Sequence, residues 1–192
     1  MTEIHEAAWR RVDVDHGLGF VAFVIEPDGS EAFGAEVVVD GTTSYSVNFA
    51  VAADAGWRSR SLVAEVLTAG RPRHVDLTGD GRGSWMVDGV PQPYLDGCLD
   101  VDIVSTPCTN THAIRRLGLE VGESTDIKAA WVDVPSLTVT LANQRYTRLE
   151  AGLYEFRSLG SGRAYEVSVD EHDLIVDYQD FAERVSRQRC AD

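Results

Sequence analysis

The chain of 192 residues predicts a mostly β fold, built from antiparallel strands with two short helices. Short segments in which apolar and polar side chains alternate recur along the sequence, and turn-favouring Gly, Pro and Asp residues separate them. Only two segments carry apolar residues at helical spacing. A length near 200 residues suits one all-β domain, so a single domain is expected over residues 1–192.

In the first half of the chain, strands are expected at residues 8–12, 19–25, 36–40, 44–53, 57–67, 73–78 and 83–87. Gly41-Thr42 is expected to form a tight hairpin between the third and fourth of these strands. The strand over residues 44–53 has one large apolar face and one face of small or polar residues, which includes Asn48. Because a solvent face normally carries more charge, this small face is expected to line a concave space or another backbone.

Arg58 and Arg60 are expected on the same face of their strand as Leu62, Ala64 and Val66, because side chains alternate along a strand. Two guanidinium groups on an apolar face need partners or solvent. Either the strand leaves the core at this end, or the arginines meet Asp100 and Asp102 or an anionic group of a ligand.

The central run over residues 96–117 concentrates polar chemistry. Its strand places Cys98, Asp100 and Asp102 on one face, while the apolar residues between them are expected to face the core. Thr106-Pro107 is expected to stop the strand, and Thr109 or Asn110 to cap a helix that ends at Gly118. Arg115 and Arg116 on this helix would then bring two cations to the two acids.

The remaining strands are expected at residues 125–134, 136–147, 152–157, 164–170 and 174–177. Gln144 and Tyr146 share one face of the second of these strands. A terminal helix is expected from Asp177, because four apolar residues follow at spacings i, i+3, i+4 and i+7: Tyr178, Phe181, Ala182 and Val185.

Composition narrows the possible functions. A net charge of −14 and a pI near 4.6 argue against DNA, RNA or an anionic membrane surface as a partner. No apolar run of signal-peptide or membrane-spanning length occurs, so a cytoplasmic location and no transmembrane segment are expected. Three cysteines, Cys98, Cys108 and Cys190, are expected to be reduced thiols.

The acid pair of the central strand permits several interpretations. Asp100 and Asp102 would lie roughly 6 to 7 Å apart, within the range of glycosidase pairs, but both would approach a substrate from the same side. Ion pairs with Arg58, Arg60, Arg115 or Arg116, or binding of a polar head group, are the alternatives. No metal-ligand spacing, nucleophile elbow or phosphate loop occurs, so no catalytic residue, metal or cofactor is predicted.

The sequence Asp-Gly-Cys-Leu-Asp-Val-Asp from Asp96, followed by Thr-Pro, Thr-Asn and Ile-Arg-Arg-Leu, resembles the bacterial putative glycolipid-binding domain family. Further similarity lies at residues 85–89 and 143–147. The resemblance implies a spiral β-roll or half-barrel, similar to lipoprotein carriers, and non-enzymatic binding of a glycolipid-like or other amphipathic small molecule. The chain differs from the family pattern at Cys108, where Phe is expected, and at His112-Ala113, where Leu-Pro is expected.

These observations predict an apolar cavity whose mouth lies beside residues 106–112, near Asn48, Arg58 and Asp102. The predicted ligand-binding residues are Asn48, Arg58, Arg60, Asp100, Asp102, Thr109, Asn110, Arg115, Arg116, Gln144 and Tyr146. Two other functions remain open. One is an enzyme that uses the corner of Asp100, Asp102, Arg115 and Arg116, and the other is a structural or protein-interaction domain without a ligand.

Overall fold

The computed structural model describes residues 1–185 and has a mostly β fold. The strands of the first half are β1 (Glu3–Arg11), β2 (His16–Glu26), β3 (Gly29–Asp40), β4 (Thr43–Asp54), β5 (Ser59–Thr68), β6 (Arg71–Gly79), β7 (Trp85–Val87) and β8 (Val90–Pro91). A 3-10 helix, η1 (Pro93–Leu95), β9 (Asp100–Ile103) and α1 (Cys108–Leu117) follow. The last strands are β10 (Ser124–Val132), β11 (Val139–Glu150), β12 (Leu153–Ser158), β13 (Ala164–Val169), β14 (Ile175–Tyr178) and β15 (Ala182–Arg184).

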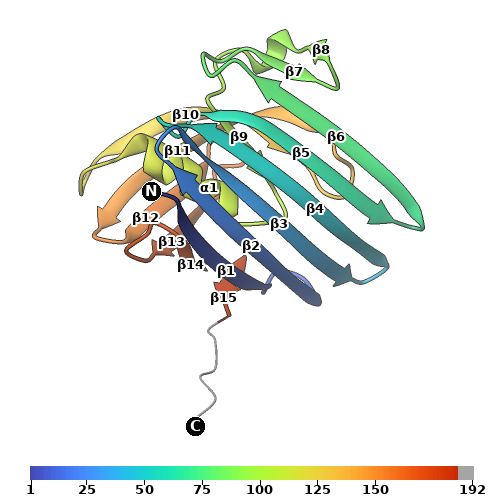
Figure 1. Cartoon of the computed structure of the whole chain (residues 1–192). Helices are drawn as coiled ribbons and strands as arrows, with labels where there is room; N and C mark the ends of the chain where they lie inside the picture. The colour runs from blue at the N-terminus through green and yellow to red at the C-terminus, as the bar shows by residue number, and fades with distance from the viewer. Residues whose placement is uncertain (186–192) are drawn as a thin grey trace.

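These strands form one 15-stranded sheet that curls into a spiral. The strand order runs from β8 back to β1 and then through β15 down to β9. The pairing is antiparallel except between β9 and β10, which are parallel. The end strand β9 returns to the start of β5, where the Ser59 amide donates to the Leu99 carbonyl over 2.9 Å. The sheet therefore closes partly on itself, with β1 to β6 in front of the later strands (Figure 1).

The first half of the chain forms the long strands of the sheet. The turn at Gly41 and Thr42 is confirmed, because Asp40 pairs with Thr43 and Gly41 has a φ of 53° that favours glycine. On β3, Gly34 lies against the ring of Phe49, and a Cβ added there would be 2.2 Å from Cζ. A side chain at position 34 is therefore incompatible with the observed position of Phe49.

The large face of β4 is packed as expected, but the small face does not line a concave space. Tyr45, Val47, Phe49 and Val51 are buried in the interior, whereas Asn48 on the small face is exposed. The small face belongs to the outer surface. Ala50 on this face pairs with Phe33 of the neighbouring strand β3, and the Phe33 side chain is exposed to solvent. The predicted space on the small face is therefore not formed, because small side chains suit an exposed face as well as a cavity wall.

The predicted face for Arg58 and Arg60 is also wrong. Ala52 pairs with Ser61 and Ala53 with Ser59, so Arg60 is the extra residue of a β-bulge. The bulge inverts the alternation, and Ser59 is buried on the same side as Leu62. Both arginines are consequently exposed on the outer side.

Helix α1 lies inside the roll. It ends as expected at Gly118, which has a left-handed φ of 53°. It begins at Cys108, whereas Thr109 or Asn110 was the expected N-cap residue. The observed N-cap residue is Pro107, whose side chain makes no capping hydrogen bond. The ring of His112 lies 6.0 Å from that of Phe23 and 5.7 Å from that of Trp57, so the helix packs against the inner side of the first half of the sheet.

Over residues 177–185, the described part of the expected terminal helix, the chain instead forms the end of β14, a turn and β15. Tyr178 pairs directly with Ala182 across this hairpin, and Asp180 in the turn has a φ of 56°. Apolar residues four apart fit one face of a helix, but they also face each other across a tight hairpin. The β15 strand instead completes the sheet by pairing with β1.

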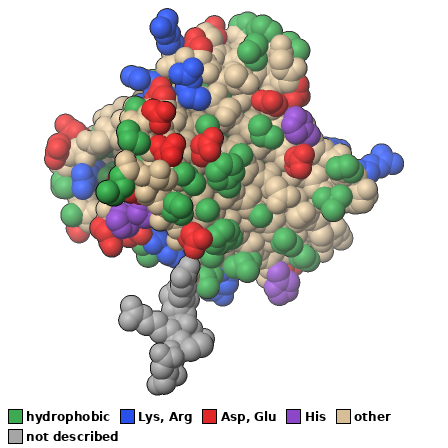
Figure 2. All heavy atoms as spheres, in the orientation of Figure 1, with side chains coloured by type: hydrophobic (Ala, Val, Ile, Leu, Met, Phe, Trp, Pro, Cys, Tyr) green, Lys and Arg blue, Asp and Glu red, His purple; other side chains and the backbone are tan. Residues whose placement is uncertain are grey.

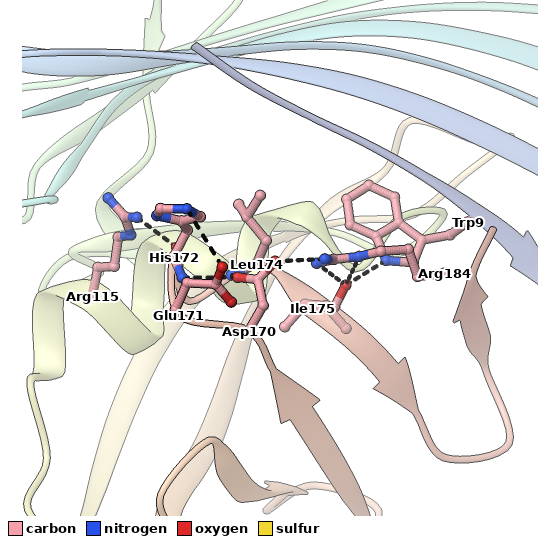
Figure 3. Close-up of polar contacts among 8 residues, drawn as sticks. All are labelled: Trp9, Arg115, Asp170, Glu171, His172, Leu174, Ile175 and Arg184. Carbon is pink, nitrogen blue, oxygen red and sulfur yellow. Dashed lines mark hydrogen bonds and ion pairs between the residues drawn. The ribbon is translucent and has the colours of Figure 1, made fainter. Parts of the chain in front are cut away.

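A turn over residues 170–174 fastens the last hairpin to the rest of the molecule (Figure 3). Arg184 donates to the Ile175 carbonyl over 2.8 Å and forms a 2.5 Å ion pair with Asp170. The Trp9 indole donates to the same carbonyl over 2.9 Å. On the other side, Arg115 of α1 donates to a backbone carbonyl of this turn. The turn and the first residue of β14 together therefore connect α1, β1 and β15.

Two further findings concern the cysteines and the membrane. Cys98 and Cys108 are both buried free thiols, and Cys190 lies outside the described residues. Burial raises the pKa of Cys98 to about 11 and raises that of Cys108 further. In the part of the chain that the structure describes, no helix combines the length and the apolar character required to cross a bilayer.

Candidate functional site

A cleft of about 920 Å³ opens between the strands of the second half of the sheet, α1 and the turn after β14. Its walls come from β9 to β13, from Asn110 on α1 and from Tyr178, Asp180 and Phe181 near the last hairpin. A volume of this size is within the range of small-molecule sites, which are roughly 300 to 1,000 Å³. This cleft is the candidate site.

Asp102 provides the polar corner of the cleft. Its carboxylate accepts a 3.0 Å hydrogen bond from the Thr109 hydroxyl and a 2.5 Å bond from the Gln144 amide. Burial raises the pKa of Asp102, while these two donors partly offset that increase. Beside it, the Asn110 amide donates to the Tyr146 hydroxyl over 2.7 Å, which fixes the side chain that α1 contributes. The Asp102 carboxylate thus has neutral partners and no cation of its own.

Aromatic rings form an apolar part of the cleft lining. Tyr178 contacts three other rings edge to face at interplanar angles of 61° to 64°, with centroid distances of 5.9 Å to Phe156, 5.7 Å to Tyr165 and 4.9 Å to Phe181. Such edge-to-face packing holds the rings in fixed positions. Trp131 of β10 adds a partly exposed indole to the cleft. The cleft therefore combines an apolar aromatic lining with a polar corner at Asp102.

Charged side chains in the cleft are mostly acidic. Asp13, Asp102 and Asp180 line it, against one cation, Arg163. Asp13 is paired with Arg11 over 2.6 Å, and Arg11 also lies 4.3 Å above the ring of Phe181. Among residues 1–185, the cleft acids without an ion-pair partner are therefore Asp102 and Asp180.

A buried ion pair lies behind Asp13. Arg11 donates to Glu36 over 3.2 Å and to the Ser105 carbonyl over 2.9 Å. Burial raises the pKa of Glu36 to about 7, although Arg11 acts to lower it. Burial alone would lower the pKa of Arg11, but the bond to Asp13 and the two acids raise it overall. This pair anchors β1 and β3 to the segment after β9, and no local pattern of residues indicates it.

The structure separates the predicted acid and arginine corner into three places. Asp100 forms the predicted ion pair with Arg116, through two hydrogen bonds of 2.8 and 2.6 Å. Burial raises the pKa of Asp100, and Arg116 acts against that effect. Arg115 points elsewhere, with its guanidinium 4.5 Å above the Trp57 ring and 3.7 Å from Asp173. Asp102 has no arginine partner, contrary to the expectation.

Asp100 and Asp102 do not flank one space. Asp102 lines the cleft, whereas Asp100 and Arg116 line a smaller neighbouring pocket of about 390 Å³. The geometry that would make the two carboxylates a hydrolytic pair is therefore not formed. Among residues 1–185, no group of three or more His, Cys, Asp or Glu side chains is arranged to hold a metal ion.

Of the predicted binding residues, Asp102, Asn110 and Gln144 line the cleft. Thr109 holds Asp102 in place, and Tyr146 holds Asn110, through the hydrogen bonds described above. Asn48, Arg58 and Arg60 are exposed on the outer side, so the cavity does not extend to the position predicted for it near Asn48 and Arg58.

The aromatic lining was not recognised from the sequence. Tyr178 and Phe181 were assigned to a terminal helix, and Phe156 and Tyr165 belong to a different hairpin. Phe156 and Tyr165 pair directly across β12 and β13, which the expected hairpin between them could have suggested. Their contact with Tyr178 depends on how β14 joins the sheet.

Comparisons with known proteins agree with this architecture. The model of a family described as "Putative glycolipid-binding" matches residues 6–184. A crystal structure of a DUF1089 family protein from Pseudomonas aeruginosa is 36% identical and has a TM-score of 0.77; the match covers 87% of this chain and 92% of that chain. A beta-barrel-like protein of domain of unknown function DUF1849 from Brucella abortus is 10% identical and has a TM-score of 0.53, with 94% of each chain covered, which supports the fold alone. Curated proteins give no match.

Proposed function

Because this chain belongs to the family described as putative glycolipid-binding, we propose that it binds an amphipathic small molecule with an uncharged, hydroxyl-rich head group in the cleft. The observation that carries the proposal is the Asp102 carboxylate, which lines the cleft and is bonded only to neutral donors. Aromatic side chains, among them Phe156, Tyr165 and Phe181, line the same cleft. A ligand with a polar end and an apolar end fits both.

The head group would bind at the polar corner. A carboxylate offers about four acceptor positions, and two of those on Asp102 are occupied by Thr109 and Gln144. Sugar hydroxyls are donors that can use the others. Because Thr109 and Gln144 hold the carboxylate in one orientation, little conformational entropy is lost when a ligand binds.

The apolar part would lie along the aromatic lining. Tyr165, Phe181 and Trp131 are partly exposed in the cleft, and Leu141 is exposed at its edge. Each methylene group removed from water contributes roughly 0.8 kcal/mol. A short polar sugar without an alkyl chain would lack this contribution and is expected to bind much more weakly.

The charge of the head group distinguishes this proposal from binding of any detergent-like molecule. Within residues 1–185, Asp102 and Asp180 line the cleft without an ion-pair partner, against one arginine, Arg163, so a phosphate or sulfate head group would be repelled. Decyl maltoside, below the concentration at which it forms micelles, should quench or shift tryptophan fluorescence saturably and raise the melting temperature. Decyl phosphate and maltose should do neither.

Substitutions of cleft residues test whether decyl maltoside binds in the cleft. Gln144→Leu and Asp102→Asn should each weaken decyl maltoside binding by about tenfold, the equivalent of one strong hydrogen bond. Asp126→Asn is the matched control, because Asp126 is an exposed acid of β10 that does not line the cleft. Equal binding of decyl maltoside and decyl phosphate, or unchanged affinity in both cleft variants, would contradict the proposal.

A further inference from the structure

A second pocket, of about 650 Å³, lies at the other side of the sheet between the turn that joins β4 to β5 and the turn that joins β6 to β7. Three arginines, Arg58, Arg60 and Arg82, line it together with Asp54 and Asp80. It shares no lining residue with the cleft. Figure 2 shows basic side chains gathered over this end of the sheet, interspersed with acidic ones.

The two aspartates are already used to hold the turns. One oxygen of Asp54 accepts hydrogen bonds from the amides of Gly56, over 2.9 Å, and Arg58, over 3.1 Å. One oxygen of Asp80 accepts from the amides of Arg82, over 2.7 Å, and Ser84, over 3.0 Å. These amides lower the pKa of Asp80, so it remains charged in its turn. Asp54 and Asp80 therefore use their oxygens mainly to accept backbone hydrogen bonds, and they neutralise the charge of the arginines only in part.

The guanidinium groups are partly pre-positioned and largely without partners. Arg60 donates to the Gly79 carbonyl over 3.2 Å and lies 3.8 Å from Asp54. It also packs so closely on Gly81 that a Cβ there would be 2.7 Å from its Nη1. For Arg58 and Arg82, no side-chain hydrogen bond or ion pair is formed with any of residues 1–185.

We propose that this pocket is a binding site for a small phosphate-bearing anion, separate from the cleft. A guanidinium binds two oxygens through a planar pair of N–H groups. A phosphate has enough oxygens to bind more than one arginine in this way, whereas the two oxygens of a carboxylate are both occupied by a single arginine. Three cations against two acids make this pocket locally basic in a chain of net charge −14. An anion repelled by most of the surface therefore has a defined place to bind.

Isothermal titration with inorganic pyrophosphate, at constant ionic strength, tests the site. Saturable binding of one pyrophosphate per chain is expected, and acetate at the same ionic strength should give none. Arg58→Gln and Arg82→Gln should each raise the dissociation constant about tenfold, the loss expected for a charge-assisted hydrogen bond. Arg73→Gln is the matched control, because Arg73 is an exposed arginine of β6 outside the pocket.

Two outcomes would overturn the proposal. One is the absence of saturable binding at millimolar pyrophosphate, and the other is an equal loss of binding in Arg73→Gln, which would indicate general attraction of anions to surface arginines. Melting curves of the variants show whether they remain folded. The pyrophosphate titration contains no decyl maltoside, and the arginines that it tests do not line the cleft. The outcomes of the pyrophosphate and decyl maltoside experiments are therefore independent.

Discussion

Replacing His112 with Leu is expected to stabilise the protein, and to do so more strongly in acid. His112 is 1% exposed within α1, and neither ring nitrogen has a hydrogen-bond partner among the described residues. Burial, and secondarily the charge of Arg115, lowers its pKa to about 4. Leucine fills a similar volume without a polar atom.

The magnitude follows from proton linkage. The unfolded chain binds a proton at this histidine below about pH 6.5, whereas the folded protein does so only below about pH 4. Acidification through this window favours the unfolded state, so stability is full above about pH 6.5 and is lost as the pH falls. At pH 5 the loss is about 2 kcal/mol. At pH 7.5 the variant should already gain about 1 to 3 kcal/mol by removing unsatisfied nitrogens.

Urea denaturation of both proteins at pH 7.5 and pH 5 provides the free energies of unfolding. The difference between variant and wild type is the informative quantity, because Glu36 acts in the opposite direction. Its folded pKa of about 7 exceeds the unfolded value of 4.5, so acidification from pH 7 to 4.5 stabilises the fold through Glu36 in both proteins. Subtraction removes this contribution.

The advantage of the variant should be about 2 kcal/mol larger at pH 5 than at pH 7.5. An advantage that is the same at both pH values would show that His112 is not buried in its neutral form. A variant that is less stable than wild type at pH 7.5 would show that the imidazole makes stabilising contacts that the structure lacks.

Three further predictions test the packing. Asp100→Ala should cost about 3 to 5 kcal/mol in denaturant melts, because it leaves a buried guanidinium unpaired, and Asp100→Asn should cost less; equal costs would argue against the ion pair. Neither Cys98 nor Cys108 should react with iodoacetamide in the native protein, because burial raises both thiol pKa values, so intact mass should show two more alkyl groups after denaturation than before it. Gly34→Ala should cost about 1 to 3 kcal/mol in thermal or urea melts, because its Cβ would meet the Phe49 ring, and an unchanged melt would show that the ring moves freely.

The sequence determined those features that depend on neighbouring residues. Alternation along β4 identified a strand with one buried face, and Gly41 and Gly118 identified a hairpin and a helix end. The arrangement of Thr106 and Pro107 between a strand and a helix was likewise confirmed. Each of these signals is local, because backbone conformation and side-chain period act over a few residues.

Side-chain orientation depended on tertiary structure. The alternation of β4 did not reveal which face points inward, because both a cavity wall and an outer surface accept small residues. A single bulge residue at Arg60 reversed the face of the arginines. Tyr178 and Ala182 fitted a helix by spacing, but pairing between β15 and β1 favoured the hairpin.

The candidate site was predicted in part for the same reason. Asp102 and Asn110 lie close in the chain, and their proximity followed from a strand and helix joined by a short turn. Gln144 is 42 positions from Asp102, and the bond between them exists because β9 pairs with β10 and β10 with β11. The order of strands across the sheet decides such contacts, and that order depends on interactions among all the strands rather than on any one segment.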